Sequence, residues 1–375
     1  MSKADWQIIS KIFLGWIVLT QILLTISPLI LPFQPSFPYA SELARYQLPL
    51  HLDKLAHFDG VHYLTIAEKG YLGTGLIQAF FPLLPLLMSW LNALIQNTLL
   101  SGLLITHVFA FLALASFYYL VRLHFSKKIA CWSLFFFTFF VSSFYLRALY
   151  TESLFLTLIF TSLITAHKRY YWLAGVLAAL ASATRITGVF LYPSLLYLIY
   201  SSDRRNWWAY LAVSLGPLGL LAYMGYLQQV FGDPLYFFHV QSEFGASRQT
   251  NLVSLPQVIW RYIKILWTVR PFDLKYYAYV QEFALSLWAL FVLIRATMTK
   301  HRYLRTYLIF AWPAYLLPPL TGNFSSMPRY LLICFPLFIY LAWRGTRKQK
   351  IFYLTISIIL LIINLILFAG GYWVA

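Results

Sequence analysis

Charged residues are scarce in this chain. Of 375 residues only 10% are Asp, Glu, Lys or Arg, whereas about a quarter is usual in a soluble globular domain. Hydrophobic residues make up 61%, and they recur in apolar runs of about twenty residues, the length of a membrane-crossing helix. The short alternating segments of a membrane barrel do not dominate. The composition therefore predicts an all-α, polytopic integral membrane protein whose single domain spans residues 1–375.

Cysteines and nucleotide-binding motifs are also nearly absent. The two cysteines, Cys131 and Cys334, fall inside apolar runs, so we expect neither a disulfide nor a cysteine metal site. No Gly-rich nucleotide cradle, Walker sequence or DxD pair occurs, which disfavours a soluble nucleotide sugar as substrate. We expect a site that uses neither a metal nor a cofactor.

Acidic residues are few, 11 against 28 Lys and Arg, and the formal net charge is +17. The basic residues lie in short clusters between apolar runs, as the positive-inside rule describes. The expected partner is therefore the lipid bilayer and not nucleic acid. The first apolar run, 12–33, is too long for a signal-peptide core and lacks a small-x-small cleavage site. It is predicted to be a permanent first helix.

Eleven membrane helices are expected, with the N-terminus cytoplasmic and the C-terminus outside. In this topology 17 of the 28 Lys and Arg residues lie in cytoplasmic segments or at the cytoplasmic ends of the spans. The segment 76–96 carries Pro82 and Pro85, and a full span there would invert every later loop, so it is predicted to be a re-entrant or interfacial helix. It belongs to the first outer loop, 34–97, and a second large outer loop covers 227–277. The predicted spans are 12–33, 98–121, 129–147, 150–166, 171–185, 187–200, 207–226, 278–295, 304–320, 329–343 and 351–370.

The scarce acids gather on the predicted outer face, where nine of the eleven fall. Longer outer loops explain part of this bias, and an outward-facing active site would explain the rest. The nine acids are Glu42, Asp53, Asp59, Glu68, Glu152, Asp233, Glu243, Asp273 and Glu282.

Asp59 is the leading candidate for a catalytic group. It lies in FDGVHYLTIAEKGY, where an interfacial helix over 61–69 should begin. Two interpretations stay open and can coexist: the carboxylate caps the helix, or it acts as a general base at the mouth of a lipid-lined cavity. Glu68, beside Lys69 in the same motif, is either a solvated surface charge or a substrate contact.

Three further motifs place ionisable residues at the ends of apolar spans. In YTES, Tyr150 and Glu152 lie at an outer helix boundary, where Glu152 either suits the helix dipole or shapes the site. In ATRITG, Arg185 lies at a turn between two short spans, where it either binds phosphate or snorkels to the interface. In NFSSMPRYLL, Arg329 begins an outer helix. The dipole disfavours a cation there, so we expect an anionic partner such as phosphate.

The second outer loop contains FFHVQSEFG, with His239, Gln241 and Glu243 at alternate positions. This spacing lines one face of a strand, whereas on a helix only the outer two would share a face. Because no other ligand cluster accompanies them, a sugar contact is favoured over zinc. Other candidates for hydrogen bonds to a sugar are Asn323, Ser325 and Ser326.

HFDGVHYLTIAEKGY at 57–71, followed by AFFPLLPLL at 79–87, resembles the first outer loop of the GPI mannosyltransferase 2 (PIG-V) family. That family and its prokaryotic relatives carry W-D-x-x-x-F/Y-x-x-I-A-x-x-G-Y and then F-F-P-x-x-P. Further matches are ALYTESLFL at 148–156, LAALASATRITGVFL at 177–191 and MPRYLLICFPLF at 327–338. They follow one another in the expected order across most of the chain.

The resemblance implies the GT-C fold of multi-pass glycosyltransferases. It also implies an inverting transfer of mannose, or a related hexose, from a polyprenyl-phosphate-linked donor to an acceptor hydroxyl on the outer or lumenal face. The acceptor would be a glycan, a glycolipid or a protein. The base of the family lies in the first outer loop, a role that comes to Asp59, and Phe58 stands where the family has tryptophan. The membrane would be a prokaryotic plasma membrane or the endoplasmic reticulum.

A polytopic lipid or sugar transporter, or a flippase without transferase activity, is the main alternative. It predicts repeat symmetry between the two halves of the chain and ionisable residues deep in the bilayer. The sequence shows no convincing internal repeat, and its acids gather on one face. A non-catalytic subunit of a larger enzyme is a third interpretation.

Overall fold

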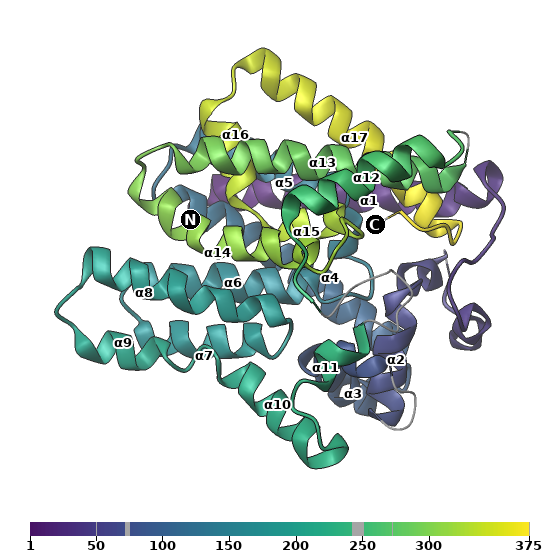
Figure 1. Ribbon diagram of the computed structural model, residues 1–375, viewed down its shortest axis with the longest axis horizontal. Coiled ribbons are helices and arrows are strands. Elements are labelled where there is room, and N and C mark those ends of the chain that lie inside the picture. Colours follow the sequence, from purple (N-terminus) through teal and green to yellow (C-terminus); the bar gives the residue numbers. More distant parts are fainter. Residues whose placement is uncertain (50, 72–75, 242–250, 272, 375) are drawn as a thin grey trace.

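The computed structural model describes residues 1–49, 51–71, 76–241, 251–271 and 273–374, and every regular element among them is helical (Figure 1). The predicted all-α class is therefore confirmed. The α-helices are α1 (Lys3–Ile30), α2 (Asp59–Lys69), α3 (Leu83–Ile95), α4 (Thr98–Arg122), α5 (Lys127–Thr138), α6 (Glu152–His167), α7 (Tyr171–Ser182), α8 (Leu191–Ser202), α9 (Trp207–Val213), α10 (Leu218–Phe231), α11 (Tyr236–His239), α12 (Leu255–Thr268), α13 (Leu274–Thr297), α14 (Arg302–Leu320), α15 (Met327–Ile333), α16 (Pro336–Arg344) and α17 (Arg347–Ala369). The short 3-10 helices are η1 (Ala40–Tyr46), η2 (Leu52–Ala56), η3 (Ile77–Ala79), η4 (Ser143–Leu146) and η5 (Ile186–Phe190).

Each of the eleven predicted spans corresponds to one helix or to a pair of helices joined by a break. Five segments are long and apolar enough to cross a membrane by themselves: α1, α4, the α9–α10 pair, α13 and α17. These segments, together with the shorter apolar helices between them, make this an integral membrane protein with several crossings.

Three predicted spans are interrupted where the sequence pattern suggested one continuous helix. The span 329–343 divides into α15 and α16 at Cys334 and Phe335, directly before Pro336. The span 207–226 divides around Pro217, and 129–147 divides into α5 and η4. Proline lacks the backbone N–H that a continuing helix requires, which accounts for the breaks at Pro336 and Pro217. The break in 129–147 contains no proline. The apolar pattern continues through such breaks and therefore does not predict them.

The break between α9 and α10 is stabilised by a serine from a neighbouring helix. The Ser182 hydroxyl donates to the Gly216 carbonyl at 2.7 Å and accepts the Leu220 N–H at 3.2 Å. Backbone groups freed inside a membrane protein need such partners because lipid offers none.

The short helix α6 lies at the centre of the bundle. Almost every residue from Glu152 to Ala166 is buried, and α6 packs against α4, α7 and α8. A helix that is apolar on all sides is stable in lipid or among other helices, and α6 is surrounded by helices. The N-terminal end of α6 is thereby held in the protein interior.

The segment between α1 and α4, which we call the first outer segment after its predicted location, forms a separate layer at one end of the bundle. Its helices α2 and α3 lie there beside α11 (Figure 1). Helix α3 buries Leu84 and Met88 and exposes Leu86, Trp90 and Leu94. With 13 residues it is too short to cross a bilayer. This agrees with the predicted re-entrant or interfacial helix in 76–96.

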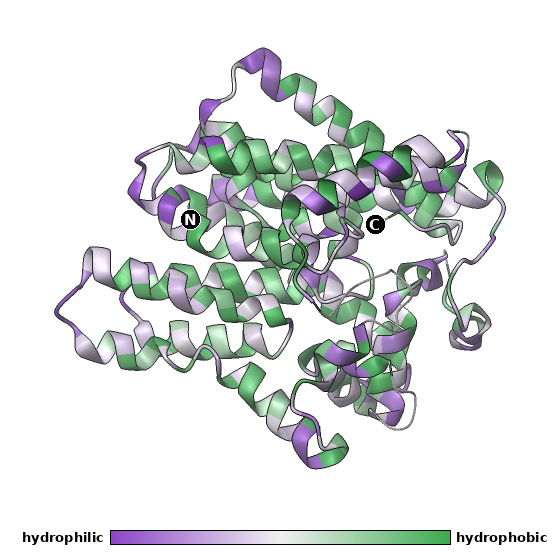
Figure 2. Ribbon diagram, in the orientation of Figure 1, coloured by the Kyte–Doolittle hydropathy of each residue, from purple (hydrophilic) through white to green (hydrophobic). Residues whose placement is uncertain are grey.

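Hydrophilic turns gather at the opposite end of the bundle (Figure 2). The turns between α8 and α9, α13 and α14, and α16 and α17 lie there, and the hydrophobic stretches of the long helices lie between the two ends. These turns carry several of the basic clusters on which the predicted topology depends. Which end faces the cytoplasm stays a prediction.

A glycine in α10 provides a test of the close packing between α7 and α10. A Cβ atom on Gly219 would lie 1.9 Å from the Ala179 carbonyl oxygen, whereas a Cβ on Gly225 would meet nothing within 4 Å. Gly219→Ala should therefore lower the free energy of unfolding by about 1–3 kcal/mol. Gly225→Ala, in the same helix, should leave it unchanged or slightly higher. Thermal unfolding in detergent measures both, and equal melting temperatures would contradict the packing described.

Candidate functional site

A cavity of about 250 Å³ opens where the first outer segment meets the bundle. Asp59, Arg185 and Arg329 are its charged lining residues within the described part of the chain. The other lining residues are Tyr63, Ala79, Phe80, Phe81, Thr151, Thr184, Ile186, Thr187, Phe238, Gln241, Leu317, Pro318, Thr321, Ser325, Ser326, Tyr330 and Trp373. Segments far apart in the sequence therefore converge on one site.

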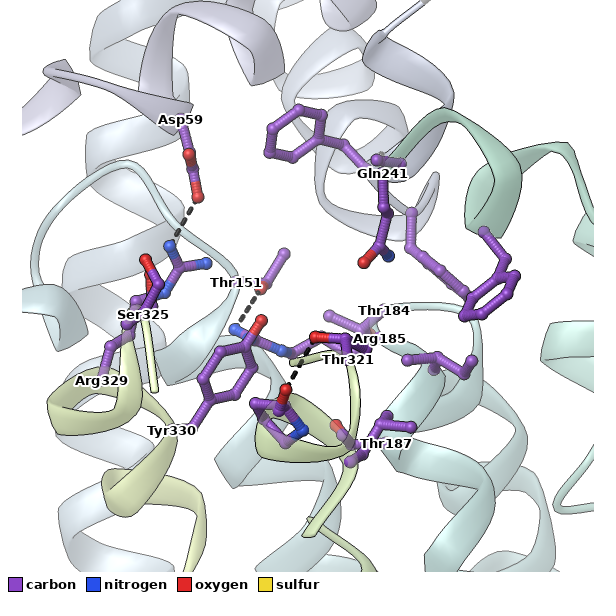
Figure 3. Close-up of a pocket in the computed structure, with 18 of the residues that line it drawn as sticks. Asp59, Thr151, Thr184, Arg185, Thr187, Gln241, Thr321, Ser325, Arg329 and Tyr330 are labelled. Atoms are coloured by element: carbon purple, nitrogen blue, oxygen red, sulfur yellow. Dashed lines mark hydrogen bonds and ion pairs between the residues drawn. The ribbon is translucent and has the colours of Figure 1, made fainter. Parts of the chain in front are cut away.

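Asp59 is the first residue of α2, and its side chain does not cap that helix. The N-cap is Phe58, which makes no side-chain capping bond. The Asp59 Oδ2 instead accepts a hydrogen bond from Arg329 Nη1 at 2.5 Å, and the Asp59 side chain is 24% exposed. The capping interpretation is wrong, because the carboxylate is directed at the guanidinium on the cavity wall (Figure 3).

The turn before Asp59 is tightly fixed. Phe58 has φ 57° and ψ −117°, which is strained for a bulky side chain, and its ring packs on Phe37 and Phe368. The Tyr150 hydroxyl accepts the Asp59 N–H at 3.2 Å and donates to the His57 carbonyl at 2.9 Å. Tyr150 therefore lies behind the cavity wall and positions Asp59.

His57 fixes the same turn from the other side. Its Nδ1 lies 2.9 Å from the Phe368 carbonyl oxygen, and the ring is buried. Burial lowers the pKa of His57 to about 4, so the ring is neutral at pH 7 and Nδ1–H is the donor in this contact. The turn that carries Asp59 is thus tied to the end of α17.

Glu152 joins the two arginines of the cavity. It is the first residue of α6 and its side chain is fully buried. Its Oε1 accepts from Arg329 Nε and from Arg185 Nη1, each at 2.5 Å. Arg185 Nη1 also donates to the Thr151 hydroxyl at 3.2 Å. We call the series Asp59–Arg329–Glu152–Arg185 the ion-pair chain.

The ion-pair chain contains two carboxylates and two guanidiniums, so its formal charges cancel. Within the described residues, Glu152 Oε2 has no hydrogen-bond partner. Both cations also lie over aromatic rings, with Arg329 Cζ 4.7 Å from the centre of the Tyr150 ring and Arg185 Cζ 5.4 Å from that of Tyr330. Such contacts favour buried cations and fix their orientation.

The surroundings of Arg185 and Arg329 decide between some of the roles that the sequence left open for them. Arg185 is in extended conformation between α7 and η5 and is buried, so it does not snorkel. Arg329 is near the start of α15, and the anions that offset the unfavourable dipole are Asp59 and Glu152. Anionic partners of Arg329 therefore lie within the chain itself, and contact with a phosphate stays a prediction.

The turn between α14 and α15 is fixed by a buried carboxylate. Ser326 has φ 64°, and its N–H donates to Glu282 Oε1 at 3.1 Å. Glu282 Oε2 accepts from the Tyr262 hydroxyl at 2.7 Å. Ser325 and Ser326 thus line the cavity next to Arg329, as their sequence position suggested.

Neutral polar groups share the rest of the cavity lining with apolar residues. Gln241 is directed into it from the side opposite Asp59 and Arg329, with Thr184 and Thr187 below Gln241 in the view (Figure 3). Thr321 and Tyr330 also line the cavity. Thr187 is buried, and its hydroxyl has no partner among the residues described. This wall offers hydroxyl and amide groups and no further charge.

Four predicted site residues do not reach the cavity lining. Tyr150 and Glu152 lie behind the wall, where they hold Asp59 and the two arginines, and Glu68 and His239 lie farther away. Glu68 pairs with Arg45 and accepts from the Tyr46 hydroxyl at 2.6 Å. His239 Nδ1 lies 2.6 Å from Asp233 Oδ2, in the short helix α11 and not on the alternating strand face considered above. Glu243 lies outside the described residues. A substrate contact by Glu68 or His239 stays a prediction.

Sequence reasoning missed several lining residues. Some of them belong to the motifs described above, although the motifs do not single them out as cavity contacts: Tyr63, Phe80, Phe81, Thr184 and Thr187. Trp373 carried no local signal. Within the described ranges no group of three or more His, Cys, Asp or Glu side chains is arranged for a metal ion. The expectation of metal-free chemistry stays a prediction.

Two solved structures are similar to this chain. ArnT from Cupriavidus metallidurans, in a crystal structure bound to undecaprenyl phosphate, matches with a TM-score of 0.51 and 10% identity over 95% of this chain and 63% of ArnT. The chain has the GT-C fold. The Archaeoglobus fulgidus oligosaccharyltransferase, in complex with Zn and sulfate, matches with a TM-score of 0.42 and 13% identity over 96% of this chain and 53% of that one.

This GT-C chain spans less than two thirds of the length of either protein. The sequence matches no protein-family model, and no curated protein sequence matches it. Membership of the GPI mannosyltransferase 2 family therefore stays a prediction, whereas the GT-C fold expected from the resemblance is confirmed.

Glu152→Gln should destabilise the GT-C fold strongly, because it leaves two buried arginines with a single carboxylate. Removing one partner of a buried ion pair reduces the free energy of unfolding by about 3–5 kcal/mol. Glu68→Gln is the matched control, and loss of its more exposed pair should change stability by about 1 kcal/mol or less. Thermal unfolding in detergent compares them. Equal stability of the two variants would show that the ion-pair chain does not organise the fold.

Proposed function

We propose that this protein is an inverting glycosyltransferase that moves mannose, or a related hexose, from a polyprenyl-phosphate-linked donor to an acceptor hydroxyl. The observation that carries the proposal is the ion-pair chain on the wall of the cavity, with Asp59 at its exposed end. The GT-C fold supports a glycosyl transfer. The ArnT structure contains undecaprenyl phosphate, which supports a lipid-phosphate donor here.

The donor phosphate would bind at Arg185 and Arg329. Both guanidiniums line the cavity, and a planar guanidinium can contact two phosphate oxygens at once. Glu152 holds the two cations in place before any substrate arrives, so little reorganisation is needed during the reaction. Preorganised charge of this kind stabilises the negative charge that develops on the departing lipid phosphate.

Asp59 would remove the proton of the acceptor hydroxyl. The acceptor oxygen forms a bond to the anomeric carbon while the bond from that carbon to the phosphate oxygen breaks, and the proton passes to Asp59 Oδ2. Attack from the face opposite the leaving phosphate inverts the anomeric configuration. The neutral groups of the opposite wall, including Gln241 and Thr187, are placed to contact sugar hydroxyls.

Arg329 couples the base to the leaving group. It contacts Asp59 before the reaction, and protonation of Asp59 weakens that contact at the moment the phosphate gains a negative charge. The guanidinium can then shift its interaction from Asp59 to the phosphate. The proton transfer and the departure of phosphate leave the total charge of the site unchanged.

The identity of the sugar and the membrane face of the reaction are supported by separate observations. Mannose is suggested by the motifs that resemble GPI mannosyltransferase 2, and the phenyl ring of Phe58 occupies the place of the family's tryptophan. The extracytoplasmic or lumenal location is suggested by the basic turns at the end of the bundle opposite α2. The acceptor would be carried by a glycan, a glycolipid or a protein, and no metal or cofactor is part of the proposed chemistry.

Asp59→Asn should reduce sugar transfer by about 10²–10⁴-fold, because asparagine cannot accept the proton. Radiolabelled polyprenyl-phosphate mannose and the reconstituted protein provide the assay. Asp53→Asn, in the same outer segment but not in the cavity lining, should retain transfer. Near-normal transfer by folded Asp59→Asn would remove Asp59 as the base. Movement of intact lipid without glycoside formation would support a flippase.

Arg329→Lys should lower kcat about 10²-fold or more, although the charge is retained. Arg329 uses two different nitrogens, Nη1 toward Asp59 and Nε toward Glu152, and lysine has only one. Exogenous guanidinium should partly restore transfer to Arg329→Ala. Arg45→Lys, on an exposed pair, is the control. A wild-type kcat for Arg329→Lys would refute the coupling role.

A further inference from the structure

The segment after α17 folds back over the first outer segment. The Gly370 carbonyl accepts the Gln34 N–H at 2.8 Å, and the Gly371 carbonyl accepts the Ser36 N–H at 2.9 Å. Gly371 has φ 83°, and a Cβ there would lie 2.8 Å from Pro35 Cα, so this close approach requires glycine.

A second anchor holds the other end of the segment. The Val374 carbonyl accepts from Gln281 Nε2 at 3.2 Å, and Val374 is buried. The backbone on both sides of Trp373 is therefore fixed by hydrogen bonds to elements distant in the sequence. Such an arrangement holds a side chain in a defined position.

Trp373 is the residue whose side chain these hydrogen bonds hold in position. Its indole lines the cavity together with Asp59 and is 41% exposed. It lies edge-on to the Phe58 ring, with 5.6 Å between ring centres and 76° between planes. Because Phe58 directly precedes Asp59, the indole belongs to the side of the cavity where the proposed base lies. The two arginines extend from Asp59 toward the opposite side.

We propose that Trp373 is the platform of an acceptor subsite and that the acceptor is a carbohydrate. This inference rests on the proposed function, since it concerns the molecule whose hydroxyl loses its proton to Asp59. A pyranose ring has an apolar face of C–H groups and an edge of hydroxyls. Packed on the indole, it would direct one hydroxyl toward Asp59 while others meet neutral donors such as Ser325 (Figure 3).

The chemistry of the subsite distinguishes a sugar from other acceptors. A large, rigid aromatic surface that is partly open to solvent favours a flat apolar partner with polar edges. A serine side chain is too small to cover the indole, and a linear alcohol offers no polar edge. In the reaction, the acceptor oxygen bonds to the anomeric carbon, the bond to the donor phosphate breaks, and Asp59 takes the proton.

The test compares acceptors in nanodiscs, since detergents with sugar head groups would compete. Polyprenyl-phosphate mannose is the donor, and methyl α-mannopyranoside, an acetylated serine peptide and 1-pentanol are the acceptors. Trp373→Ala should raise KM for the mannoside about tenfold and leave KM for the donor unchanged. Trp373→Phe should lie between. Trp267→Ala, which removes an indole that is 89% exposed on α12, should behave as wild type.

A binding measurement complements the kinetics. Methyl α-mannopyranoside should change the tryptophan fluorescence of the wild type and of Trp267→Ala, and the change should be lost in Trp373→Phe. Equal effects of Trp373→Ala and Trp267→Ala would assign Trp373 to membrane anchoring and overturn the inference. Preferred transfer to the peptide or to pentanol would overturn it while leaving the proposed function intact. Absence of transfer to every acceptor by the wild type would overturn both.

Discussion

The shared contact of two arginines with one buried carboxylate is the interaction on which the site depends. Removing ions from water costs several kcal/mol each, and the loss is offset only when partners and geometry are good. Glu152 meets this condition because its Oε1 binds both Arg185 and Arg329. Asp59 completes the chain at the cavity surface. Three helices and an extended turn are thereby held in one arrangement, and any displacement of α6 would move both cations.

Irregular backbone surrounds this site and makes it possible. Arg185 lies between α7 and η5, Ser325 and Ser326 lie between α14 and α15, and Asp59 follows a strained residue. In a membrane protein, backbone outside helices is stable where it lines a cavity or finds partners in protein. The anchors described above, from Tyr150 and Glu282, provide such partners. The charged residues of the site therefore lie at the places where helices are interrupted.

The sequence predicted the charged core of the site better than its surroundings. Asp59, Glu152, Arg185 and Arg329 were identifiable because an ionisable residue at the end of an apolar span needs a partner. Their mutual contacts were not predicted, since the pairing of Asp59 with Arg329 across 270 positions leaves no local trace in the sequence. The helix breaks were missed because apolar composition continues through them. Trp373 was missed because its position results from hydrogen bonds between segments at opposite ends of the sequence.

The length of α6 has a consequence for how a lipid reaches the cavity. Its 16 residues extend about 24 Å, whereas the hydrocarbon layer is about 30 Å thick. Lys168 and Arg169 follow its C-terminal end and belong at the aqueous boundary on that side. The floor of the cavity, at the other end of α6, then lies about 6 Å beneath the opposite boundary. The donor phosphate proposed to bind there would lie below the plane of the lipid head groups, and its prenyl chain could leave sideways between helices without bending toward water.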